Sequence, residues 1–241
     1  TGVAARQAAQ ADPLSSWGLR IESVAQPVGA TAAIQECGLS PRLYCAPTDG
    51  AWLSWALEDA AVFADLRPAC RAAGQLDPRA WLRAREQVEA ELLSRWHIET
   101  ALLSCLQLAG LAMAQRWLEE GQWQLIYFDG ISVILARRGS KTAQQWGGDR
   151  RLQERGLDLL RREAASIEEA LSSGRRTVLP VRLLGAAAFY QATGRWREAA
   201  AALELAARAR PGAGSLELEL ARARLGAGDR TGARAALDRY L

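Results

Sequence analysis

The sequence predicts an α/β domain with a mostly parallel sheet and a β-hairpin at its edge, followed by an all-α domain of helical hairpins. Two observations lead to this prediction. Strand-like and helix-like segments alternate along residues 18–138, and such alternation is typical of parallel sheets with helical crossovers. Every segment of residues 149–241 reads as helix, and small residues recur there at an interval of 34 positions.

Local signals define each element of the first part. Gly38 suits the end of a helix because glycine adopts the left-handed conformation. Asp49 is a good N-cap, and Asp77 followed by Pro78 is a typical helix start. The predicted order is a helix or linker at 1–17, strand 18–24, helix 30–37, strand 42–46, helix 50–57, strand 61–65, helix 78–95, strand 98–103 and helix 106–120.

The strongest local signal is a β-hairpin. Two alternating apolar segments, residues 123–128 and 131–137, flank the dipeptide Asp129-Gly130. Aspartate and glycine tolerate the backbone angles that a two-residue hairpin turn requires. We therefore predict a two-residue turn at Asp129-Gly130 and regard Asp129 as a turn residue.

The second part begins after a polar segment, residues 139–148, which we interpret as a linker. A helix at 150–171 could cap the stack, and two helical hairpins follow at about 181–213 and 214–241. The arginine-rich stretch 150–162 is either a solvated helix face, which we favour, or a site for phosphate or lipid.

Three residue pairs define the interval of 34: Gly194 with Gly228, Ala199 with Ala233, and Leu203 with Leu237. Glycine separates the two helices of a hairpin, and alanine lets them approach closely. With Tyr190 and Trp196 at aromatic positions, about 60 residues resemble the tetratricopeptide repeat family. The resemblance implies a scaffold that binds proteins. Tyr240, where the family usually has a small residue, departs from the pattern.

Three further segments carry a second resemblance: LYCAPTDGAWLSWAL (43–57), VFADLR (62–67) and WQLIYFDGISVILARR (123–138). They are similar to the water-soluble region that follows the membrane helices of bacterial glycosyltransferase-like proteins related to dolichyl-phosphate-mannose protein mannosyltransferases. In that group an α/β domain often precedes tetratricopeptide repeats. The resemblance implies an extracytoplasmic, periplasmic domain associated with a membrane, with catalytic acids in membrane segments that this chain lacks.

Charge and hydropathy argue against several classes of partner. The net charge is +3 with 24% charged residues, so no concentrated basic tract indicates nucleic acid. The longest uncharged run, residues 100–115, is shorter than the roughly 20 apolar residues of a membrane-spanning helix. The chain begins at Thr1 and not at methionine, which suggests a processed or excised piece.

The cysteines and the single histidine do not predict a metal site or a cofactor. Cys37, Cys45, Cys70 and Cys105 form no CxxC pair, and only His97 could join them. Unpaired thiols are the simpler expectation, although Cys37 and Cys45 could pair in an oxidising compartment. Glycine-rich phosphate-binding motifs and the GxSxG elbow of serine hydrolases are also missing from the sequence.

Two sets of residues are candidates for function. Asp49, Asp65 and Arg67 would follow strands at the edge where open α/β sheets bind ligands, although a capping aspartate and a surface ion pair explain them more simply. On the repeats, we expect Tyr190, Trp196 and Arg224 to lie on the surface that meets a partner. No residue is predicted to be catalytic.

Three functions are compatible with these patterns. The first is a non-catalytic protein-interaction module, extracytoplasmic and bound to protein partners that include membrane subunits, with a cytoplasmic location as the alternative. The second is the soluble end of a membrane glycosyltransferase that uses a polyprenyl-phosphate-linked sugar. The third is a structural subunit of a larger complex. We favour the first because stacked helical hairpins create a large concave surface.

Overall fold

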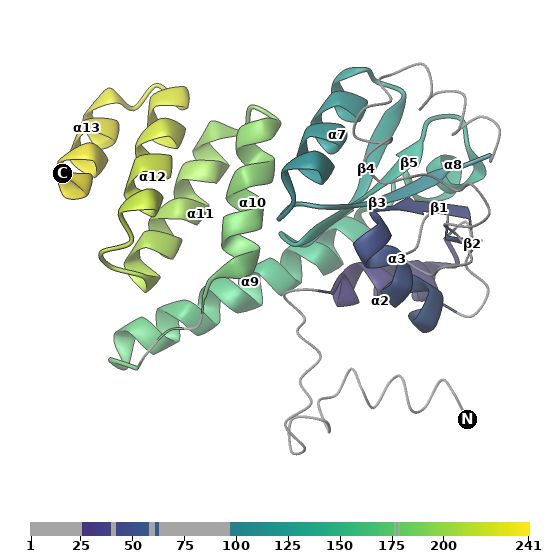
Figure 1. Ribbon diagram of the computed structural model, residues 1–241, viewed down its shortest axis with the longest axis horizontal. Helices are drawn as coiled ribbons and strands as arrows, with labels where there is room; N and C mark the ends of the chain where they lie inside the picture. Colours follow the sequence, from purple (N-terminus) through teal and green to yellow (C-terminus); the bar gives the residue numbers. More distant parts are fainter. Residues whose placement is uncertain (1–25, 40–41, 58–60, 63–96, 176, 178) are drawn as a thin grey trace.

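The computed structural model describes residues 26–39, 42–57, 61–62, 97–175, 177 and 179–241 (Figure 1). The predicted elements at 1–17, 18–24 and 78–95 lie outside these residues. The described strands are β1 (Arg42–Cys45), β2 (Ala61–Val62), β3 (Thr100–Ser104), β4 (Trp123–Phe128) and β5 (Ser132–Arg137). The described helices are α2 (Val28–Cys37), α3 (Pro47–Ala56), α7 (Leu108–Glu119), α8 (Lys141–Trp146), α9 (Arg150–Ser172), α10 (Val181–Ala192), α11 (Trp196–Ala209), α12 (Gly214–Gly226) and α13 (Arg230–Tyr240).

The described strands form one sheet in the order β2-β1-β3-β5-β4. β1 pairs in parallel with β2 and β3, whereas β5 pairs antiparallel with β3 and β4. The described sheet is therefore mixed, where the sequence predicts a mostly parallel one. The difference arises because β5, the second strand of the hairpin, pairs with β3 in the antiparallel direction. The first strand, β4, is then left at the edge of the sheet.

The β-hairpin forms as predicted, but its turn is shifted by one residue. Phe128 pairs with Val133, so Asp129 and Ser132 close the turn and Gly130 and Ile131 form its tip. Gly130 has a φ of 84°. Oδ1 of Asp129 accepts hydrogen bonds from the backbone N–H groups of Ile131 and Ser132, at 2.9 and 2.8 Å. Through these two bonds the side chain of Asp129 caps the turn. Asp129 therefore precedes the tip and is not one of its two residues.

Each face of the sheet has its own hydrophobic core. Leu102 and Ile134 point to the face covered by α2, α3 and the first turn of α9. Leu103 and Leu135 point to the opposite face, where Trp117 of α7 packs. This second core continues without interruption into the helical hairpins, through residues that include Leu183, Phe189 and Leu203.

The segment predicted as a linker contains a short helix, α8. Oγ of Ser140 accepts a hydrogen bond from the backbone N–H of Ala143 and so caps the helix, whose last residue is Trp146. Trp146 packs against the core on the α2 face. The polar composition of residues 139–148 does not predict this helix. The helix packs against β4 and β5, and such contacts with distant segments are not visible in the local sequence.

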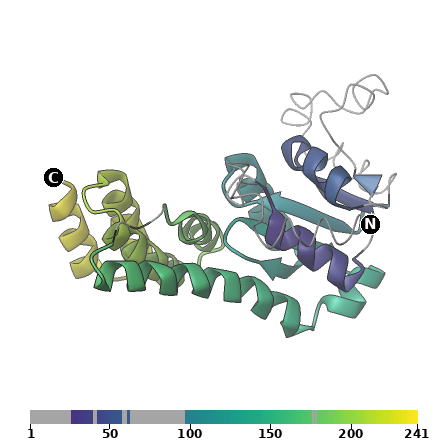
Figure 2. The same cartoon turned by 90° about the horizontal axis from the view of Figure 1, so that it is seen from below.

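The long helix α9 joins the two parts of the molecule. It is a leucine-rich amphipathic helix of 23 residues, and Asp149 is its N-cap. The prediction of a helix at 150–171 is confirmed. It contacts β4 and α2 near its start, and it also contacts α10 and α11. Figure 2 shows it running beneath both the sheet and the hairpins. Gly156 permits the close approach, since an added Cβ would lie 2.1 Å from the carbonyl oxygen of Phe128.

Helices α10 to α13 are joined by short turns and pack side by side as two helical hairpins (Figure 1). Gly194 and Gly228 end the first helix of each hairpin with φ angles of 73° and 84°. Ala199 and Ala233 are 0% and 6% exposed. The third pair differs between the hairpins, because Leu203 is 3% exposed whereas Leu237 is 40% exposed.

Candidate functional site: a charged groove on the helical hairpins

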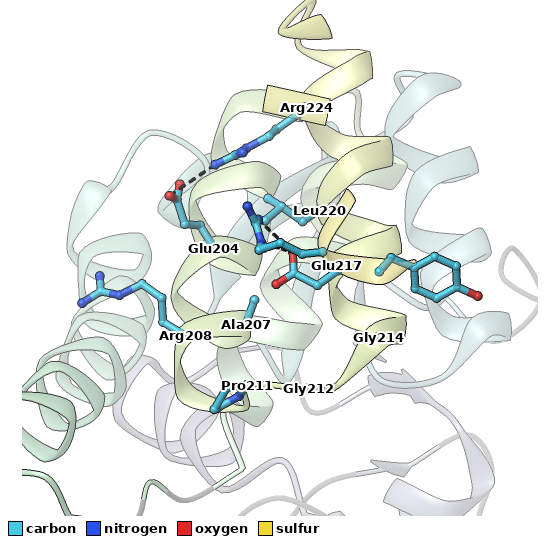
Figure 3. Close-up of a pocket in the computed structure, with 11 residues that line it drawn as sticks. Glu204, Ala207, Arg208, Pro211, Gly212, Gly214, Glu217, Leu220 and Arg224 are labelled. Carbon is cyan, nitrogen blue, oxygen red and sulfur yellow. Dashed lines mark hydrogen bonds and ion pairs between the residues drawn. The ribbon is translucent and has the colours of Figure 1, made fainter. Parts of the chain in front are cut away.

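A groove with a volume of about 610 Å³ lies among α11, α12 and α13 (Figure 3). α12 packs against both α11 and α13, and it supplies the middle of the groove. The residues that line the groove are Glu204, Ala207, Arg208, Pro211, Gly212, Gly214, Glu217, Leu220, Arg224, Arg239 and Tyr240. A surface of this kind offers both charge and apolar area to a ligand.

Two ion pairs cross between the helices of the groove. Arg224 of α12 lies 3.2 Å from Glu204 of α11, and Arg239 of α13 lies 2.9 Å from Glu217 of α12. Arg224 also donates a hydrogen bond to the carbonyl oxygen of Gly232, at 3.1 Å. The hydrogen bond to Glu217 raises the pKa of Arg239 above its usual value. The two pairs hold both carboxylates of the groove in place.

The remaining lining is apolar at the floor and open at the rim. Leu220 is 1% exposed at the floor, whereas Tyr240 is 47% exposed, and an added Cβ at Gly214 would lie 3.2 Å from its ring. Arg208 is exposed, and among the described residues it forms no ion pair. Figure 3 shows its side chain extending away from the two ion pairs. The groove therefore combines a guanidinium at its rim with an exposed aromatic ring and a buried leucine.

The three residues predicted on the repeat surface have different environments. Arg224 lies in the groove, as an ion-pair partner. Trp196 is half-buried and packs against α12, where an added Cβ at Gly226 would lie 2.4 Å from the indole. Tyr190 is only 7% exposed, so its side chain belongs to the core and not to an exposed docking surface.

Tyr190 is buried because it stands where the hairpins meet the sheet. Its ring lies 5.3 Å from that of Phe128 at the end of β4, and the guanidinium of Arg195 lies 4.5 Å from its centroid. The 34-residue pattern identifies Tyr190 as an aromatic position of a hairpin. It carries no information about the sheet, which covers the residue from outside the repeat.

The ligand site predicted at Asp49, Asp65 and Arg67 is described only in part, since Asp65 and Arg67 lie outside the described residues. The helix begins at Pro47 with Ala46 as its N-cap, so Asp49 is not the N-cap that the sequence predicts but a residue of the first turn. Proline at the first helical position explains the earlier start, because its missing N–H needs no partner there.

Asp49 has an unusual environment for a carboxylate. It is 5% exposed, and its Oδ2 has no hydrogen-bond partner. Burial raises its pKa to about 6. It follows β1, and the direction of the crossovers changes between β1 and β3, which is the position where open α/β sheets bind ligands. Its predicted partners Asp65 and Arg67 lie outside the described residues, and one buried carboxylate does not define a site.

Of the charged residues that line the groove, the sequence predicts Arg224 but not Glu204, Arg208, Glu217 or Arg239. The sequence shows that residues 217, 220 and 224 share one helix face. It does not show their ion-pair partners on α11 and α13, because these helices meet only when the hairpins stack.

The cysteines that the structure describes are free. Cys37 is half-buried, whereas Cys45 and Cys105 are buried. The alternative of a bond between Cys37 and Cys45 is therefore not realised. Burial raises the pKa of the Cys105 thiol well above its usual value. Within the described ranges, no cluster of histidine, cysteine and acidic side chains has the arrangement of a metal site.

In the part of the chain that the structure describes, no helix is long and apolar enough to cross a bilayer. No protein-family model, no curated protein and no solved structure matches this chain significantly.

Proposed function

We propose that this chain is a protein-docking module whose helical hairpins, of tetratricopeptide type, present the groove among α11, α12 and α13 to a partner protein. The observation that supports the proposal most directly is the groove itself, with its exposed tyrosine, its rim arginine and its fixed ion pairs. Exposed aromatic rings and guanidinium groups are the side chains that contribute most often to binding energy at protein interfaces.

The assignment to the tetratricopeptide type rests on the position of the recurring residues. Gly194 and Gly228 end helices, and Ala199 and Ala233 are buried, in agreement with the family pattern. The extracytoplasmic location that we propose rests on the sequence resemblance of residues 43–57, 62–67 and 123–138 alone.

The proposal can be tested by site-specific photo-crosslinking in the organism that makes the protein. A photoreactive phenylalanine analogue would replace Tyr240, an exposed residue that lines the groove, or Glu119, an exposed residue of α7 that serves as the control. We expect a discrete crosslinked product from position 240 and none from position 119. Equal products from both positions, or no product from position 240, would contradict docking in the groove.

A further inference from the structure

We propose that the groove binds a peptide segment of its partner in which a carboxylate side chain neighbours a large apolar side chain. This inference rests on the proposed function and adds the chemistry of the segment that is recognised. Three guanidinium groups, from Arg208, Arg224 and Arg239, line the groove against two carboxylates, from Glu204 and Glu217. The lining therefore has a surplus of one positive charge.

The position of that surplus charge is defined by the ion pairs. Glu204 and Glu217 already bind Arg224 and Arg239. Arg208 is left at the rim without a carboxylate among the described residues. A carboxylate from the partner would complete its pairing, whereas a cationic side chain would have to compete for glutamates that are already paired.

The apolar half of the groove defines the second requirement. Leu220 and Ala207 are buried apolar residues of the lining, and Tyr240, which is 47% exposed, lines the same groove at Gly214. A leucine or aromatic side chain of the partner would cover this ring and remove its apolar area from water. The volume of about 610 Å³ accommodates a few side chains of an extended or helical segment.

A nucleic-acid strand fits this groove less well than a peptide does. Glu204 and Glu217 line the groove together with the arginines and pair with two of them. A phosphate backbone would approach these carboxylates with like charge, and its affinity depends on many unopposed cations in a row. One surplus guanidinium beside an apolar floor instead favours a single carboxylate with an apolar neighbour.

The experiment selects peptides from a random dodecamer display library on the immobilised full chain and measures the affinity of the enriched peptides by fluorescence polarisation. We expect enriched peptides to share aspartate or glutamate next to leucine, phenylalanine or tryptophan. For Arg208→Glu we expect about tenfold weaker binding, which corresponds to a loss of about 1.4 kcal/mol. Tyr240→Ser should also weaken binding, because it removes the exposed ring.

The matched control is Arg197→Glu, the same charge reversal at another exposed position of α11, outside the groove. It should leave the affinity unchanged, and circular dichroism should show that all variants remain folded. Three results would overturn the inference: enriched peptides without an acidic residue, equal binding to Arg208→Glu and the unmodified chain, or displacement of the peptides by single-stranded DNA.

The same experiment separates this inference from the proposed function. Peptides that bind but are insensitive to Arg208→Glu would reject the groove chemistry, while crosslinking from position 240 would still support docking on the hairpins. If neither peptides nor crosslinked products are found, both the inference and the proposed function are wrong.

Discussion

The guanidinium of Arg182 lies 2.8 Å from Oδ2 of Asp129, and this ion pair joins the turn of the β-hairpin to the first turn of α10. The side chains are 15% and 1% exposed. The hydroxyl of Tyr127 donates to the same Oδ2, at 3.0 Å. On the other side, Glu163 of α9 accepts hydrogen bonds from the backbone N–H groups of Arg182 and Leu183. Sheet, α9 and α10 are thus joined at one buried point.

Removal of one partner of this pair should destabilise the protein strongly. We expect Asp129→Ala or Arg182→Met to lower the free energy of unfolding by about 3–5 kcal/mol, because each leaves a buried charge without its partner. The double variant should lose less than the sum of the two single variants. Urea unfolding followed by circular dichroism measures these losses.

The control for this prediction is Arg155→Ala, which removes an ion pair with Glu36 whose side chains are 41% and 56% exposed. Little or no loss of stability is expected there, because solvent screens exposed pairs. If Arg182→Met were as mild as Arg155→Ala, the buried pair would have no special role.

Gly185 of α10 should not tolerate alanine. An added Cβ would lie 1.9 Å from the carbonyl oxygen of Gly130, which is part of the backbone and cannot rotate away. We expect Gly185→Ala to cost about 1–3 kcal/mol of unfolding free energy, although alanine is the better helix former. Gly148→Ala, where an added Cβ meets nothing within 4 Å, is the control and should change stability little. Thermal unfolding of both variants checks this, and equal melting temperatures would contradict the close contact.

The helix contact at Ala199 should be equally sensitive to size. Ala199 is 0% exposed, so Ala199→Leu would force larger atoms between packed helices. We expect a loss of about 1–3 kcal/mol in unfolding free energy. Ala201→Leu, on the exposed side of the same helix, should be close to neutral. A neutral Ala199→Leu variant would mean that the recurring alanines do not control how closely the helices pack.

Asp49 should make stability depend on pH. Its pKa is raised from 3.8 to about 6 by burial, so the folded state binds a proton more tightly than the unfolded state does. The contribution of this group is therefore fully present below about pH 4 and is lost as the pH rises through about 6, by an amount on the order of 3 kcal/mol. Asp49→Asn should stabilise the protein at pH 7 and remove this dependence.

The measurement is urea unfolding of the unmodified chain and of Asp49→Asn between pH 4 and pH 7.5. The difference between the two curves isolates the contribution of Asp49 from that of the other carboxylates. A difference that stays constant over this range would show that the Asp49 carboxyl is not buried in a way that raises its pKa.

Local signals in the sequence predicted most described elements. The alternating residues around Asp129-Gly130 predicted β4 and β5, and the leucines of residues 150–171 predicted α9. Gly38 ends α2 in the left-handed conformation, with a φ of 56°, as expected. Each of these signals acts over a few neighbouring residues, so sequence spacing alone reveals it.

The errors concern contacts between distant segments. The sequence predicts only a turn residue at Asp129, because its partner Arg182 is 53 positions away. The mixed pairing of the sheet depends on which strand of the hairpin adds to β3, and local patterns do not specify that choice. The groove residues on α11 and α13 likewise come together only through stacking.

The ring of Phe128 packs against the helical hairpins, so the α/β part and the hairpins cannot be separated without exposing apolar surface. This ring lies 4.7 Å from that of Phe189 and 5.3 Å from that of Tyr190, and Phe128 is only 4% exposed. A truncation after residue 148 would uncover this aromatic surface together with Val133 and Leu135 on the same face of the sheet. Such a fragment would be prone to self-association, so expression of the α/β part alone requires polar replacements on that face.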